Sequence, residues 1–99
     1  MYNSKYFDQV FTDIQEAKIL YKVQKEGLKV EYALAIETAI QRVLKMPTSY
    51  LPRYKNVRIA HPKTFPNNIH FYIDEVNQTV VFTAIVHIKR EHKFAMNRI

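Results

Sequence analysis

The sequence contains no cysteine among its 99 residues. A disulfide framework, a thiolate metal site and a thiol nucleophile are therefore excluded. This composition suits a reducing compartment, so we expect the protein to act in the cytoplasm. Glycine is nearly absent too, since Gly27 is the only one. A glycine-rich phosphate loop cannot be built from one glycine, and we expect no cofactor.

Long apolar runs are also missing. No stretch of about 18 apolar residues occurs, which argues against a membrane-spanning helix. Residues 1–6 have no apolar stretch following a basic one, so we expect no signal peptide. His87 and His92 are five positions apart and lack the spacing of zinc ligands, so we expect no metal site. Glycine-flanked serine nucleophiles and paired carboxylates are absent as well.

What the chain does contain is enough apolar material for a core and a surplus of positive charge. Hydrophobic residues make up 47% of it, with seven Tyr and six Phe. Fifteen basic residues against nine acidic ones leave a formal charge of +6. A surplus of this size on a small body attracts polyanions or an acidic protein. The length predicts one domain, residues 1–99.

Two amphipathic helices are predicted in the first half, at about residues 8–26 and 28–46. Apolar side chains recur at spacings of three and four, which places them on one face of each helix. They are Phe7, Val10, Ile14, Ala17 and Tyr21, then Tyr32, Ile36, Ala39 and Val43. Gly27 separates the helices because a residue without Cβ adopts the left-handed conformation easily, and Pro47 ends the second. The short turn predicts an antiparallel hairpin.

The second half alternates with the period of a strand. Val57–His61, Ile69–Asp74 and Thr79–Ile88 are predicted strands, and the Tyr-rich residues 2–6 a further edge strand. Thr79–Ile88 has apolar residues on both parities, which indicates a central strand. The predicted fold class is α+β, with an N-terminal antiparallel helical hairpin (about 8–46) packed on a three- to four-stranded antiparallel sheet (about 55–90).

Basic residues gather in two groups, interleaved with aromatic and imidazole rings. The first group is Arg53, Lys55, Arg58 and Lys63, the second is Lys89, Arg90, Lys93 and Arg98, and the rings are Tyr50, Tyr54, His61, His87 and His92. If the last strand lies beside the first long one, the groups meet at one end of the sheet. Such a surface suits a phosphate backbone with an unstacked base, or an acidic peptide. The plainer interpretation is a solvated face.

The histidines differ in their surroundings. His87 stands in an apolar strand, which favours a hydrogen-bonded structural role. His61 and His92 lie in predicted loops, where an imidazole can transfer protons near neutral pH.

The order of these segments resembles that of the RelE/ParE toxins over roughly residues 10–90. The segments that carry this resemblance are Asp13–Ala17, Tyr21 and Gln24–Leu28 in the hairpin, then Pro47, Tyr54, Val57-Arg58, Phe65-Pro66, Ile69, Tyr72 and Ile73, and finally Ala84–His87 with Lys89-Arg90. The resemblance implies a type II toxin that is neutralised by a cognate antitoxin, an acidic and partly disordered protein. It also implies one of two activities: cleavage of messenger RNA on the ribosome, or poisoning of DNA gyrase.

The two long helices and the His87-x-x-Arg90 ending favour the second activity, and the sequence departs from the family pattern in two places. Asn67-Asn68 follow Phe65-Pro66 where the family usually has Tyr-Gly, and no tyrosine follows Tyr72 to complete a nuclease set. We therefore predict a ParE-like inhibitor of DNA gyrase, which is not an enzyme. Its predicted contacts with target or antitoxin are Arg53, Tyr54, Lys55, Lys63, His87, Lys89 and Lys93.

Two alternatives remain. In a RelE-like ribosome-dependent endoribonuclease, Arg58 and Arg90 would stabilise the developing phosphate charge while His61 or His92 moves protons. The second alternative is an inactive relative, or a small basic module that binds RNA or protein.

Overall fold

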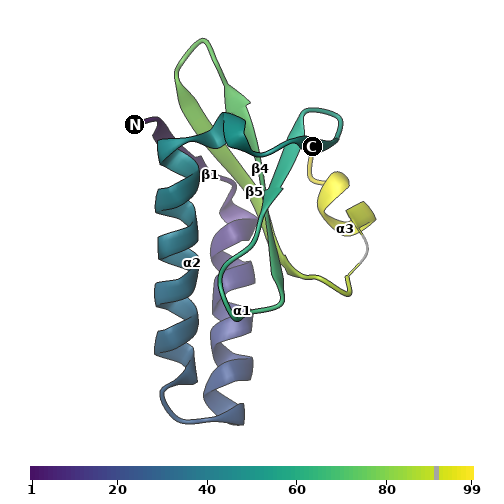
Figure 1. Cartoon of the computed structure of the whole chain (residues 1–99). Coiled ribbons are helices and arrows are strands. Elements are labelled where there is room, and N and C mark those ends of the chain that lie inside the picture. Colours follow the sequence, from purple (N-terminus) through teal and green to yellow (C-terminus); the bar gives the residue numbers. More distant parts are fainter. Residues whose placement is uncertain (91) are drawn as a thin grey trace.

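Two long helices, a short helix and a mixed five-stranded sheet make up the fold (Figure 1). The computed structural model describes residues 1–90 and 92–99, and the side chain of His92 lies outside the described part. The elements are β1 (Asn3–Tyr6), α1 (Asp8–Gln24), α2 (Leu28–Lys45), a 3-10 turn (Pro47–Ser49), β2 (Pro52–Tyr54), β3 (Val57–Ala60), β4 (Asn67–Asp74), β5 (Thr79–His87) and α3 (His92–Met96). The predicted α+β class and helical hairpin are confirmed.

The hairpin turns at Gly27, as predicted. This residue has a φ of 83°, in the left-handed region that favours glycine. Pro47 begins the 3-10 turn that follows α2. Tyr32, Ile36 and Val43 of α2 are buried against the sheet together with Val10 of α1. Both helices therefore cover the same sheet face, as Figure 1 shows.

The sheet has more strands than predicted, and its order is β1-β5-β4-β3-β2. β5 lies between β1 and β4, so the interior position predicted for it is confirmed. β1 pairs with β5 in parallel, whereas all the other neighbouring strands are antiparallel. β2 was not predicted, because it is three residues long and begins at Pro52. Proline is tolerated at such an edge, where one side of the strand needs no donor.

A register shift between His70 and Phe71 divides the long β4–β5 pair into two parts. Phe82 pairs with Phe71 and Ala84 pairs with His70, which leaves Thr83 as the extra residue of a bulge. Val80, Phe82 and Ile85 consequently face the helices. Ala84 and Val86 face the other way and pack against Ala95 of α3. The bulge thus gives the sheet a second apolar face, which α3 covers (Figure 1).

The loop predicted between the last two strands is a turn held by Asp74. Its carboxylate accepts hydrogen bonds from the Asn77 backbone N–H at 3.2 Å and from the Asn77 side-chain amide at 2.8 Å. These bonds hold the pKa of Asp74 below its usual value. This Asx turn therefore closes the hairpin, which in many proteins is closed by an Asn-Gly pair. No helix within the described residues has the length and apolar content needed to cross a membrane.

Candidate functional site

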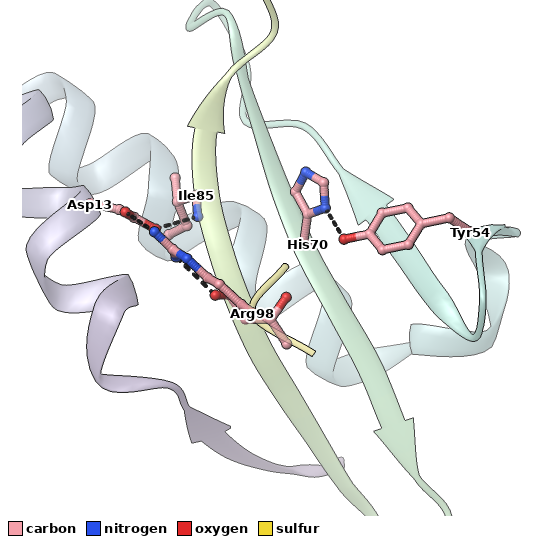
Figure 2. A network of polar contacts seen from close by, with 6 residues as sticks. Asp13, Tyr54, His70, Ile85 and Arg98 are labelled. Carbon is pink, nitrogen blue, oxygen red and sulfur yellow. Dashed lines mark hydrogen bonds and ion pairs between the residues drawn. The ribbon is translucent and has the colours of Figure 1, made fainter. Parts of the chain in front are cut away.

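The end of the chain returns to the outer edge of β5 and is fastened there by Arg98. The Arg98 guanidinium donates to the Asp13 carboxylate at 2.7 and 2.9 Å, and to the Thr83 carbonyl at 3.0 Å. The same carboxylate accepts the Ile85 backbone N–H at 2.9 Å. Both side chains of the ion pair are largely buried, with 11% and 7% of their surface exposed. We name Asp13, Arg98 and their contacts with β5 the clasp. Figure 2 shows how it joins α1, β5 and the C-terminal segment.

An aromatic ring lies between two cations beside the clasp. The guanidinium carbon of Arg90 is 4.2 Å from the centre of the Phe94 ring, and that of Arg98 is 4.9 Å from it. Both distances are within the range of cation–π attraction. The Arg90 side chain is exposed. The ring therefore fixes the position of an accessible positive charge.

A cleft of about 230 Å³ opens between α1, the end of β5 and this stack. Its lining residues are Asp13, Glu16, Ala17, Leu20, Tyr21, Asn67, Ile85, Val86, His87, Arg90 and Phe94. Asn67 is 5% exposed, and its side-chain oxygen has no hydrogen-bond partner among the described residues. The cleft offers a buried amide, an exposed guanidinium and apolar walls, which is a mixture suited to a peptide.

A second polar pair lies on the sheet face that α3 covers. The Tyr54 hydroxyl and His70 Nδ1 share a hydrogen bond of 2.8 Å, and the two side chains point toward each other in Figure 2. His70 is fully buried, and burial raises the pKa of Tyr54. Tyr54 was a predicted contact residue, whereas His70 was not predicted to be functional. The signal was its position between Ile69 and Phe71, which places it on the opposite face from those core residues.

Two of the four predicted catalytic residues, Arg58 and His61, lie in β3 or directly after it. Arg58 pairs with Phe71, a residue of the helix-facing core, and its guanidinium donates to the backbone carbonyls of Thr48 and Tyr50. It lies on the opposite sheet face from His70. His61 is exposed, and its Nδ1 lies 3.2 Å from the Asn67 carbonyl oxygen.

The other two predicted catalytic residues are near the end of the chain. Arg90 stacks on Phe94. The backbone of His92 begins α3, and its side chain is outside the described part.

The strand order does not bring the two basic groups together in the way that was predicted. β4 separates β3 from β5, so the last strand does not lie beside the first long one. The register places Lys63, which follows β3, at the same end of the sheet as His87. Arg53 and Lys55 lie at the opposite end, around the turn between β2 and β3.

Six of the seven predicted contact residues are exposed, and Tyr54 is half-buried. Arg53, Lys55, Lys63, His87, Lys89 and Lys93 are all exposed. His87 is exposed at the end of β5, and it makes a hydrogen bond of the kind predicted for it. Its Nδ1 accepts the Lys89 backbone N–H at 3.1 Å. Among the described residues, no group of three or more acidic, histidine or cysteine side chains could hold a metal ion.

Neither the scan against protein-family models nor the search of curated sequences finds a match to this chain. Solved structures do match. A chain of the chromosomal ParDE toxin–antitoxin system from P. aeruginosa is 13% identical, with a TM-score of 0.73 over 88% of this chain and 96% of that one. The isolated E. coli RelE toxin is 11% identical, with a TM-score of 0.61 over 98% of this chain and 95% of that one. The protein therefore has the RelE/ParE fold.

Proposed function

We propose that this protein is the toxin of a type II toxin–antitoxin pair and acts in the cytoplasm by binding a protein, with DNA gyrase as the target. A cognate antitoxin, acidic and partly disordered, neutralises it. The shared fold with a ParDE chain and with the RelE toxin supports the toxin assignment. The net charge of +6 supports an acidic partner.

One observation carries the choice of binding over catalysis. Arg58, which a nuclease site would use to stabilise the phosphate charge, already donates to two backbone carbonyls. A phosphate-stabilising arginine needs its donors aimed at the place where charge develops. By contrast, Arg90, Phe94 and the buried Asn67 all line the cleft beside β5. This arrangement suits recognition of a polypeptide.

A supercoiling assay tests the proposed target. Purified protein at micromolar excess should inhibit supercoiling by gyrase, and addition of the antitoxin should restore it. The variant Arg90→Glu should inhibit less, whereas Lys29→Glu, which reverses an exposed charge at the far end of the hairpin, should inhibit as the native protein does. Full supercoiling activity at micromolar excess of folded protein would contradict gyrase as the target.

The Tyr54–His70 pair supports a second candidate, a ribosome-dependent ribonuclease. A phenol and an imidazole in one hydrogen bond can pass a proton, which is what general acid–base cleavage of RNA requires. His70 is fully buried, so RNA reaches it only if the residues that cover it move. Primer extension on messenger RNA after induction would then show codon-phased cuts that Tyr54→Phe abolishes. If no cuts appear, this candidate is rejected.

A further inference from the structure

The helical hairpin carries exposed apolar side chains on the side that faces away from the sheet. Ile19 and Val23 of α1 are four positions apart, so they lie on one face of that helix, and they are 65% and 82% exposed. Val30 and Leu34 of α2 have the same spacing and are also more than half exposed. The core residues of both helices face the sheet, so these four side chains point away from it.

The turn at Gly27 brings the four residues together. α1 runs toward this turn and α2 runs away from it, so residues at similar distances from the turn are neighbours across the two helices. Val23 and Val30 are one such apolar pair, and Ile19 and Leu34 are the next. Figure 1 shows that the tip of the hairpin extends beyond the sheet. Two adjacent apolar pairs therefore face solvent.

A groove of about 420 Å³ between the two helices continues this surface toward the start of α1. Ile14, Ile36 and Ile40 line it, and Phe11, which is 55% exposed, lines it from α1. Monomeric proteins rarely leave a continuous apolar surface of this kind uncovered. We name this surface the hairpin patch, and its residues are Phe11, Ile14, Lys18, Ile19, Val23, Val30, Leu34, Ile36, Glu37 and Ile40.

The charges of the hairpin patch indicate what covers it. Lys18 of α1 and Glu37 of α2 line the groove from its two sides. The whole chain has a formal charge of +6, but these two charges cancel, so a strongly acidic partner gains little here. The pair formed by Asp13 and Arg98 is the only ion pair among the described residues. Lys18 and Glu37 are therefore available to a partner that presents one charge of each sign, as a second copy of this chain does.

Two arrangements with two-fold symmetry align the helices of facing hairpins. An axis along the groove sets α1 of each copy on α2 of the other, so Lys18 faces the partner's Glu37 at two equivalent places. An axis across the groove sets α1 on α1, which brings like charges toward each other. The first arrangement also sets Ile19 on the partner's Leu34, and Val23 on the partner's Val30. Charge and apolar surface therefore favour the same arrangement.

We propose that the hairpin patch binds a second copy of this chain in a two-fold dimer, with the axis along the groove and Lys18 paired with the partner's Glu37. Each Phe11 then lies against the partner's groove, and the four helices form one bundle. The cleft beside β5 is lined by Asp13, Ala17 and Leu20, which lie on another side of α1, so it stays open in both copies. The dimer does not depend on the proposed function.

Sedimentation velocity of the full chain at micromolar concentrations tests the dimer. The native protein should sediment as a dimer. Lys18→Glu and Glu37→Lys should each raise the dissociation constant about tenfold or more, because like charges then face each other twice. An equimolar mixture of the two variants should form a heterodimer of near-native affinity, because every facing pair again has one charge of each sign. Arg53→Glu, an exposed charge reversal outside the hairpin, should leave the dissociation constant unchanged. Thermal unfolding verifies that each variant is folded.

Three results would overturn the proposal. A native chain that stays monomeric at several hundred micromolar would mean that a different protein covers the hairpin patch. A dimer that neither variant weakens would have its interface elsewhere. Two variants that are monomeric alone and do not associate when mixed would show that Lys18 does not face the partner's Glu37. None of these results depends on toxicity, so the dimer and the proposed function are tested separately.

Discussion

Asp13 and Arg98 lie 85 positions apart in the sequence, and their side chains meet in two hydrogen bonds of 2.7 and 2.9 Å. The pair joins the first helix to the end of the chain across the edge of β5 (Figure 2). Through it, α3 is held against the second face of the sheet, where Ala95 is completely buried. The C-terminal segment is therefore part of the folded structure rather than an appended tail.

Removing one member of this pair should be costly. Arg98→Ala leaves the Asp13 carboxylate without its guanidinium in a largely buried site, and we expect the free energy of unfolding to fall by about 2–4 kcal/mol. Denaturant unfolding measures the change. Lys93→Ala, an exposed change in α3 just before Arg98, should alter stability by less than about 0.5 kcal/mol. Equal stabilities of the two variants would show that the clasp does not hold the C-terminal segment.

Arg58 offers a test of structural against catalytic roles. Its guanidinium donates to the carbonyls of Thr48 and Tyr50, next to the 3-10 turn after α2. Arg58→Ala should therefore lower the free energy of unfolding by about 1–2 kcal/mol, whereas the exposed Arg53→Ala should change it little. If Arg58→Ala kept native stability and lost all activity, Arg58 would be a functional residue and the nuclease interpretation would regain support.

Tyr32 and Tyr54 can be compared directly, because only the Tyr54 hydroxyl has a hydrogen-bond partner among the described residues. The Tyr32 hydroxyl is buried with no hydrogen-bond partner among the described residues, whereas that of Tyr54 bonds to His70. At neutral pH, Tyr32→Phe should leave stability unchanged or raise it by up to about 1 kcal/mol, and Tyr54→Phe should lower it by about 1 kcal/mol. Thermal unfolding compares the two. A larger loss for Tyr32→Phe would contradict this assignment.

Alkaline pH should destabilise the native protein, partly through Tyr32. Burial, with smaller effects from Tyr21 and Asp13, raises the pKa of Tyr32 above its ordinary value of 10.0. The folded state therefore holds the phenolic proton more tightly than the unfolded state does. This contribution is constant below pH 10.0 and is lost as the pH rises further, by up to about 1.4 kcal/mol per pH unit. Tyr32→Phe should show a shallower decline above that pH, and an unchanged slope would exclude Tyr32 as its source.

We expect Gly27 to be required only because it adopts a left-handed backbone conformation. Its φ of 83° is unfavourable for other residues, yet a Cβ at this position would meet nothing within 4 Å. Gly27→Ala should cost about 1 kcal/mol in unfolding free energy, and Gly27→Asn less, since asparagine tolerates the left-handed region better. Equal stability of Gly27→Ala and the native protein would mean that the turn can change its conformation.

The helical hairpin could be predicted from sequence because it depends on local signals. The apolar stripes, Gly27 and Pro47 all act within a few residues. The five-strand order could not be predicted in the same way. The parallel pairing of β1 with β5 joins Asn3 to Thr79, and no local pattern encodes a contact over that separation. β2 was missed because three residues starting with proline carry almost no strand signal.

The candidate site was harder to predict for a more specific reason. Val80, Phe82, Ala84 and Val86 stand at alternate positions, as residues of one face do, but the bulge at Thr83 turns the last two to the opposite face. A single extra residue reverses the parity of everything that follows it. His87 shares the face of Ile85, but it stands at the end of β5, where its side chain is exposed. The buried histidine is His70, on the neighbouring strand.

Growth after induced expression in a bacterial host tests the central claim, that this protein is a toxin, most directly. Viable counts should fall after induction of the native chain, and co-expression of the antitoxin should restore them. Filamentation and DNA breaks in the arrested cells would accompany gyrase poisoning. Unimpaired growth with folded, soluble protein confirmed in the same cells would contradict the claim and leave only the fold in common with the toxins.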